Sequence, residues 1–107
     1  MSVVNRGEVW MVDTEFGPKP YLIVSNQSRN RALGTVLGVR VTTSPNRPDI
    51  PSVVPIESKG NVVGSILCDE ISLLSKEQLR SRMANSFPPR EMQRVCVGLR
   101  SALDCGR

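Results

Sequence analysis

The sequence contains no histidine. Histidine is the side chain that most often accepts a proton near neutral pH, so its absence excludes Ser-His-Asp and Cys-His nucleophile arrangements. It also excludes the usual ligand sets of zinc sites. Any chemistry must depend on other side chains, and we expect neither a metal nor another cofactor.

Aromatic residues are scarce, at 4% of the chain. The core must therefore be mainly aliphatic, with Trp10 as one of its few large members. No apolar run approaches the roughly 20 residues that a membrane-spanning helix needs. With 107 residues, the chain predicts a single domain over residues 1–107. Its core would be modest, which favours an oligomer.

Cysteines are few, odd in number and not paired in a C-x-x-C motif: Cys68, Cys96 and Cys105. We recognise no secretory signal, so we expect free thiols in a reducing compartment and a cytoplasmic protein. Cys68 and Cys96 lie in apolar patterns, which predicts core positions rather than reactive ones.

Acidic residues are missing between Glu15 and Asp49, and the net charge is +4. Within this window lie five cations: Lys19, Arg29, Arg31, Arg40 and Arg47. The pattern predicts an electropositive rim and an anionic partner such as nucleic acid. The alternative is chance clustering, because ten acids leave long gaps fairly often, and many small basic proteins bind no anion.

The most apolar run in the first half of the chain lies between Lys19 and Asn26. We predict a loop over residues 13–19 with a turn at Gly17-Pro18, and a strand over residues 21–26 entered through Pro20. This interpretation places Lys19 at the mouth of the strand and Asn26 at its exit.

Further strands are predicted at residues 7–13, 35–43, 52–56 and 65–68, joined by loops at 27–34, 44–51 and 57–64. In the strand at 35–43, Leu37, Val39 and Val41 share one face, which we assign to the core. Arg40 and Thr42 then lie on the outward face. Gly38 on that face would leave room for a ligand to approach the backbone.

Two helices are predicted near the end of the chain. Ser75 with Gln78 three residues later forms a capping box for a short helix to about Arg82. From Pro89 to residue 104, apolar residues recur with helical spacing: Met92, Val95, Cys96, Leu99, Ala102 and Leu103. Gly106 could end that helix. Five strands, a short helix and a terminal helix predict an α+β fold, mainly β: a small barrel or half-barrel with a helix packed on it.

In their order and spacing, these segments resemble the MazF/PemK toxins of bacterial type II toxin–antitoxin systems. Residues 6–13 are similar to the family's opening strand, and residues 19–26 to its second strand, which usually begins Arg-Pro. Residues 35–42 are similar to the third strand, which ends in a Thr. Residues 65–71, 74–79 and the terminal helix complete a resemblance that covers nearly the whole chain.

The resemblance implies an SH3-like barrel of the CcdB/MazF/PemK type and a homodimer. It implies metal-independent, sequence-specific cleavage of single-stranded or loop RNA by attack of the 2′-OH, and a short acidic antitoxin that occupies the RNA groove. Carried over by position, the catalytic residues are Lys19 and Thr42. We expect RNA contacts from Glu15, Ser25, Asn26, Arg29, Arg31 and Arg40.

The chain departs from the family pattern in two places. Lys19 stands where the family usually has Arg, and the loop over residues 14–18 is short, with Glu15 as its only acid. One alternative is therefore a weakened member that binds RNA or its antitoxin without cleaving. Another is a gyrase poison of the CcdB type, which depends on an aromatic C-terminal tail, whereas this chain ends Asp-Cys-Gly-Arg.

Each candidate also has a purely structural explanation. Lys19 could be a solvated surface charge, Thr42 a good β-former and Asn26 a turn residue. Solvent exposure alone would explain Arg29 and Arg31.

Overall fold

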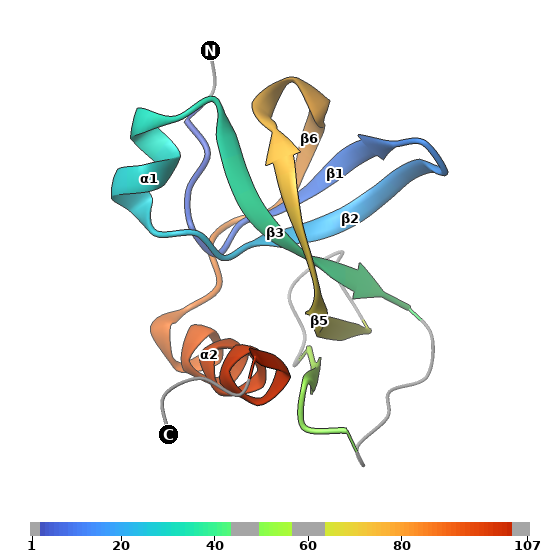
Figure 1. Ribbon diagram of the computed structural model, residues 1–107, viewed down its shortest axis with the longest axis vertical. Coiled ribbons are helices and arrows are strands. Elements are labelled where there is room, and N and C mark those ends of the chain that lie inside the picture. The colour runs from blue at the N-terminus through green and yellow to red at the C-terminus, as the bar shows by residue number, and fades with distance from the viewer. Residues whose placement is uncertain (1–2, 44–49, 57–63, 104–107) are drawn as a thin grey trace.

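The computed structural model describes residues 3–43, 50–56 and 64–103. These residues form one six-stranded antiparallel sheet in the order β4-β5-β3-β2-β1-β6, with a terminal helix packed beside it (Figure 1). The strands are β1 (Val9–Thr14), β2 (Gly17–Ile23), β3 (Thr35–Thr42), β4 (Val53–Pro55), β5 (Ser65–Ser75) and β6 (Leu79–Ala84). The helices are α1 (Gln27–Ala32), the 3-10 turn η1 (Lys76–Gln78) and α2 (Pro89–Leu103). The predicted α+β class, mainly β, is confirmed.

The β1–β2 hairpin is tighter than the sequence predicts. Thr14 pairs with Gly17, so the turn is the dipeptide Glu15-Phe16, and the predicted loop over residues 13–19 is wrong. Gly17 has φ +96°, which a glycine adopts without strain. Lys19 therefore lies inside β2 and pairs with Val12, rather than standing at the mouth of a strand.

We expected the second strand to begin only after Pro20, but β2 begins at Gly17 and includes both Pro18 and Pro20. The ladder between β2 and β3 runs only from Tyr21↔Arg40 to Ile23↔Gly38. Before Tyr21, β2 has β1 as its one ladder partner among the described residues. Pro18 and Pro20 can therefore place their nitrogens on the unpaired side without losing a ladder bond.

The strand β3 is buried on both faces. Val39 and Val41 join the cluster under α2, as predicted, but Leu37, also predicted there, is only half-buried and belongs to neither core cluster. Val36 on the opposite face lies in a second buried cluster. That second cluster also fills the space that Gly38 leaves. A Cβ on Gly38 would lie 2.8 Å from a methyl carbon of Leu74. The prediction that a ligand approaches the backbone at Gly38 is therefore wrong, since protein side chains occupy the place.

A bulge in β5 bends the sheet. Arg40 pairs with Leu67, but the residue before it on β3, Val39, pairs with Ile71. The three residues 68–70 therefore have no partner on β3, and β5 changes direction there. The strand predicted at 65–68 is only the first part of β5.

The chain after β5 is less helical than expected. Both hydrogen bonds of the predicted capping box are present around Ser75 and Gln78, but the turn that they start spans only Lys76–Gln78. The chain then pairs with β1 as β6, which makes a sixth strand where we predicted helix to Arg82. Pairing with β1 outweighs the helical preference of this short segment.

The terminal helix α2 begins at Pro89, as predicted, and ends at Leu103 within the described residues. It packs on β4 and β5 (Figure 1). The approach is close because Gly98 has no side chain: a Cβ there would lie 2.7 Å from the sulfur of Cys68. Burial, with a smaller effect of the charge on Asp69, raises the pKa of Cys68 to about 12. Its predicted core position is confirmed.

The predicted loop at residues 27–34 is instead the helix α1. Most of the loops predicted at residues 44–51 and 57–64, Arg47 included, lies outside the described residues, as do Cys105 and Gly106. Among the described helices, none has the length and apolar character needed to cross a membrane.

Candidate active site

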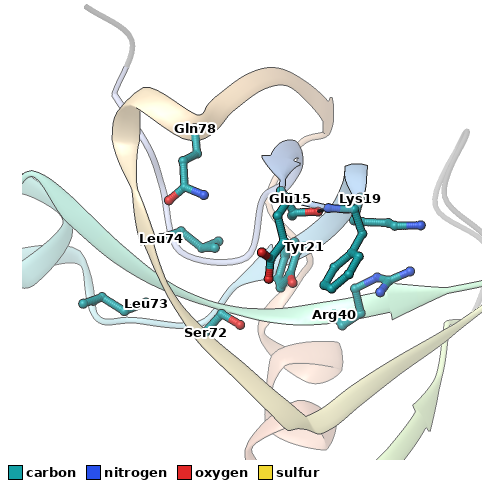
Figure 2. A pocket seen from close by; sticks show the side chains of 10 residues that line it. Glu15, Lys19, Tyr21, Arg40, Ser72, Leu73, Leu74 and Gln78 are labelled. Atoms are coloured by element: carbon teal, nitrogen blue, oxygen red, sulfur yellow. Dashed lines mark hydrogen bonds between the residues drawn. The ribbon is translucent and has the colours of Figure 1, made fainter.

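An open cleft of about 620 Å³ lies between the β1–β2 hairpin, β3 and the second half of β5 (Figure 2). The hairpin and β3 contribute the charged side chains, and β5 and η1 form the opposite wall. The lining residues are Thr14, Glu15, Phe16, Lys19, Tyr21, Arg40, Ser72, Leu73, Leu74 and Gln78. The structure thus brings together three of the predicted site residues: Glu15, Lys19 and Arg40.

Strand alternation explains why these side chains share the cleft. Lys19 and Tyr21 are two residues apart on β2, so they point to the same face. Tyr21 pairs with Arg40 on β3, which puts Arg40 on that face too. Figure 2 shows the side chains of Lys19 and Arg40 extending in the same direction from the two neighbouring strands. Two cations side by side at a cleft create a positive potential that attracts an anion.

The hydrogen bonds of the fold use Thr14 and Gln78 but leave most other polar side chains of this cleft unbonded. Within the described part of the chain, no hydrogen bond or ion pair involves the side chains of Glu15, Lys19, Tyr21 or Ser72. The Nε atom of Arg40 is buried without a hydrogen-bond partner among the described atoms. A buried polar atom costs stability unless something satisfies it, so Arg40, together with the unbonded polar groups beside it, indicates a candidate ligand site.

Thr42 lies beside the cleft rather than in its lining. It is the last residue of β3, is half-buried and pairs with Ser65. It shares a face with Arg40, two residues earlier. Continuing the β2–β3 register beyond Tyr21 would set Thr42 opposite Lys19, although the ladder itself ends at Tyr21. A Cβ on Gly64 would lie 1.9 Å from the carbonyl oxygen of Thr42, so Gly64 lets the chain pass close behind it.

The other predicted RNA contacts lie at α1, at the far end of β2 from the cleft (Figure 1). Ser25 is buried; its hydroxyl bonds to Asn30 and accepts from the backbone N–H of Leu37 at 3.0 Å. The side chain of Asn26 caps α1 by accepting from the N–H of Arg29 at 2.9 Å. None of these residues lines the cleft.

Arg29 and Arg31 occupy the same region. Arg29 donates to the carbonyl and hydroxyl oxygens of Thr35, at 2.9 and 3.2 Å, and so ties α1 to β3. Arg31 is exposed on α1. The four described cations between Glu15 and Asp49 therefore do not form one rim: Lys19 and Arg40 line the cleft, whereas Arg29 and Arg31 lie at α1.

Sequence reasoning missed Phe16, Tyr21, Ser72 and Gln78 as cleft residues. Had the strand been predicted to include Lys19, its alternation would have placed Tyr21 on the same face as Lys19. Ser72 gave no such signal, because it lies in a part of β5 that only the non-local pairing with β3 establishes.

A second charged cluster, around Glu8, lies toward β6 and outside the cleft, and its carboxylate is hydrogen-bonded within the fold. The buried carboxylate of Glu8 accepts from Asn5, from Trp10 Nε1 at 3.0 Å and from Arg82 at 3.2 Å. Burial alone would raise the pKa of Glu8, but these hydrogen bonds outweigh it and hold the pKa below its usual value. The cluster is a structural element, and Trp10 is a core residue as predicted.

Comparison with known proteins shows the family of this chain. The family model of PemK-like, MazF-like toxins of type II toxin–antitoxin systems matches residues 5–103. Endoribonuclease MazF4 of Mycobacterium tuberculosis is 35% identical over 103 residues, which cover 96% of this chain and 95% of that protein.

Solved structures give the same result. A mycobacterial endoribonuclease in complex with its cognate antitoxin superposes with a TM-score of 0.88 at 34% identity, over 97% of this chain and 98% of that chain. MazF in a MazE–MazF complex of Deinococcus radiodurans shares the fold, with a TM-score of 0.83 at 22% identity, over 99% of this chain and 100% of that chain. The chain therefore belongs to the PemK-like, MazF-like toxins of type II toxin–antitoxin systems.

Proposed function

We propose that the cleft between the β1–β2 hairpin, β3 and β5 is the RNA-cleaving site of this toxin. The chain is an endoribonuclease toxin of the MazF type. The observation that supports this location is the convergence of Lys19 and Arg40 on one cleft in which neither cation has an ion-pair partner among the described residues.

The proposed reaction needs no metal, because RNA supplies its own nucleophile. The 2′-oxygen forms a bond to phosphorus while the bond from phosphorus to the 5′-oxygen breaks. The 2′-hydroxyl proton leaves to a base, which can be a water, and the 5′-oxygen gains a proton. The products are a 2′,3′-cyclic phosphate and a 5′-OH end. DNA has no 2′-OH and cannot follow this path.

Lys19 is the proposed catalytic cation. Its ammonium group contacts a non-bridging oxygen of the scissile phosphate and donates a proton to the leaving 5′-oxygen. Thr42 donates a hydrogen bond to the other non-bridging oxygen. Arg40 adds a second positive charge and a guanidinium fork suited to phosphate. Donors aimed at developing negative charge commonly contribute about 10²–10³ in rate each.

The proposed partners follow from the relatives. The mycobacterial endoribonuclease was solved with its cognate antitoxin, and the Deinococcus MazF with MazE. We expect a short acidic antitoxin to occupy the same positive cleft, and the toxin to act as a homodimer in the cytoplasm.

The test is an RNA cleavage map of the purified protein in EDTA, with detection of 5′-OH ends. Lys19→Ala and Arg40→Ala should abolish or strongly reduce cleavage. Arg100→Ala, which removes an exposed cation from α2 outside the cleft, is the matched control and should cleave like the wild type. Absence of cleavage on diverse transcripts, tRNA included, would contradict the proposal.

A further inference from the structure

The turn at the mouth of the cleft is held by its own hydrogen bonds. The hydroxyl of Thr14 donates to the carbonyl oxygen of Gly17 at 2.6 Å and accepts from the N–H of Phe16 at 3.1 Å. One side chain therefore ties both ends of the dipeptide Glu15-Phe16. Both residues are exposed and both line the cleft, so their side chains are presented to a ligand from a fixed backbone.

Glu15 has the wrong charge for a phosphate. It is the one carboxylate in the cleft lining, and it forms no ion pair with Lys19, Arg40 or any other described residue. Figure 2 shows its side chain directed into the cleft. A carboxylate only accepts hydrogen bonds, so it repels the RNA backbone and must face a group that donates. In RNA, the bases and the 2′-hydroxyl supply such donors, and only those of the bases differ from one nucleotide to the next.

The amino groups of the bases are the donors that fit. Adenine, cytosine and guanine each carry an exocyclic NH₂. Uracil has none, and the one donor on its edge, N3–H, lies between two carbonyl oxygens that repel a carboxylate. In single-stranded RNA these edges are free of pairing and open to side chains. A carboxylate at the mouth of the cleft therefore discriminates between amino-bearing bases and uracil.

Aromatic surface lies beside the carboxylate. The side chain of Phe16 is 79% exposed, and the half-buried ring of Tyr21 lines the same cleft. The described part of the fold leaves the ring of Phe16 exposed at the tip of the hairpin. Bases of single strands stack on such rings, whatever their identity. Phe16 can supply the face of a base platform while Glu15 reads its edge.

We infer that Glu15 and Phe16 form a base subsite next to the scissile phosphate, which accepts a nucleotide with an exocyclic amino group and rejects uracil. The inference rests on the proposed function of the cleft and adds to it the class of base recognised. Glu15 determines which base is accepted, and Phe16 determines how tightly any base is held.

The test compares cleavage maps of the wild type, Glu15→Gln and Phe16→Leu on one RNA library. In the wild type, one position beside the cut should favour amino-bearing bases over uracil. An amide both donates and accepts hydrogen bonds, so Glu15→Gln should lower this preference about tenfold at that position alone. Phe16→Leu keeps an apolar side chain but loses the ring, and should weaken cleavage about tenfold for all bases there.

Glu70→Gln is the matched control, since it neutralises an exposed carboxylate on the β5 bulge away from the cleft. It should leave the base preference unchanged. If Glu15→Gln also leaves the preference unchanged while the wild type cleaves, the base subsite is refuted and the RNA-cleaving cleft stands.

Binding measurements separate the two proposals. Oligonucleotides with a 2′-deoxy group at the cut position bind without being cleaved, and they can carry each base in turn at the neighbouring position. If the wild type binds the uracil oligonucleotide more weakly than the others, and Glu15→Gln removes this difference, the subsite is supported even for a protein that does not cleave. Equal binding of all four bases to the wild type overturns it.

Discussion

The cleft and the α1 region carry similar polar side chains, but the protein uses them differently. At α1, Ser25, Asn26 and Arg29 are bonded to the protein itself. In the cleft, Lys19 and Arg40 lie on neighbouring strands and have no ion-pair partner among the described residues. Neither the residue type nor a stretch of sequence without acidic residues therefore indicates a site. A better indicator is a group of polar side chains that make no hydrogen bonds within the protein.

The largest expected effect is the loss of cleavage in Lys19→Ala. Removing a donor that stabilises the transition state should lower the cleavage rate about 10²–10³-fold. The melting temperature should stay within about 1 °C, because a half-buried cation without a partner adds little to stability. Single-turnover cleavage and thermal unfolding measure the two effects. Near-normal cleavage by this variant would remove Lys19 from the catalytic site.

The opposite behaviour is expected at α1 for Asn30→Ala. Asn30 is 1% exposed; its Nδ2 donates to the carbonyl oxygen of Ser25 at 3.0 Å and its Oδ1 bonds to the hydroxyl of Ser25. The variant removes the partner of both groups of Ser25, so the free energy of unfolding should fall by about 2 kcal/mol. Denaturant unfolding tests this. Cleavage per folded molecule should persist, and a variant that is stable but inactive would break the comparison between the two regions.

Much of the fold could be predicted because its signals are local. The apolar stripe of α2, its start at Pro89 and the capping box at Ser75 depend on residues within a turn or two of each other. The alternation of Val39 and Val41 likewise fixes one face of β3.

The wrong predictions of secondary structure lie where pairing between strands that are distant in the sequence determines the structure. The bulge at residues 68–70 extends β5 beyond its apolar run, and pairing with β1 turns the segment after Gln78 into a strand. The lining of the cleft could be predicted only in part for the same reason. Lys19 and Arg40 were predicted as site residues, but Ser72 reaches the cleft only through the β3–β5 ladder.

The Glu8 cluster extends the comparison to pH. The pKa of Glu8 is lowered in the folded protein, so its charged form stabilises the fold above the unfolded-state value near 4.5. This contribution is lost as the pH falls below 4.5 toward the folded pKa. The free energy of unfolding should therefore decrease on acidification, and less steeply in Glu8→Gln. Identical slopes for the two proteins would mean that the network does not depend on the charge of Glu8.

The smallest expected change comes from Lys19→Arg, which restores the residue that the family usually has. Both side chains carry one positive charge, but Arg offers a fork of donors, whereas Lys offers a compact point contact. If Arg40 already supplies a guanidinium beside Lys19, a second one adds little, and the rate should change by less than about tenfold. The double variant Lys19→Arg/Arg40→Ala then tests whether the cleft needs one guanidinium at either position. It should cleave better than Arg40→Ala alone, because the new guanidinium replaces the missing one. If the wild type binds RNA without cleaving and only Lys19→Arg cleaves, Lys19 marks a binding protein rather than an enzyme.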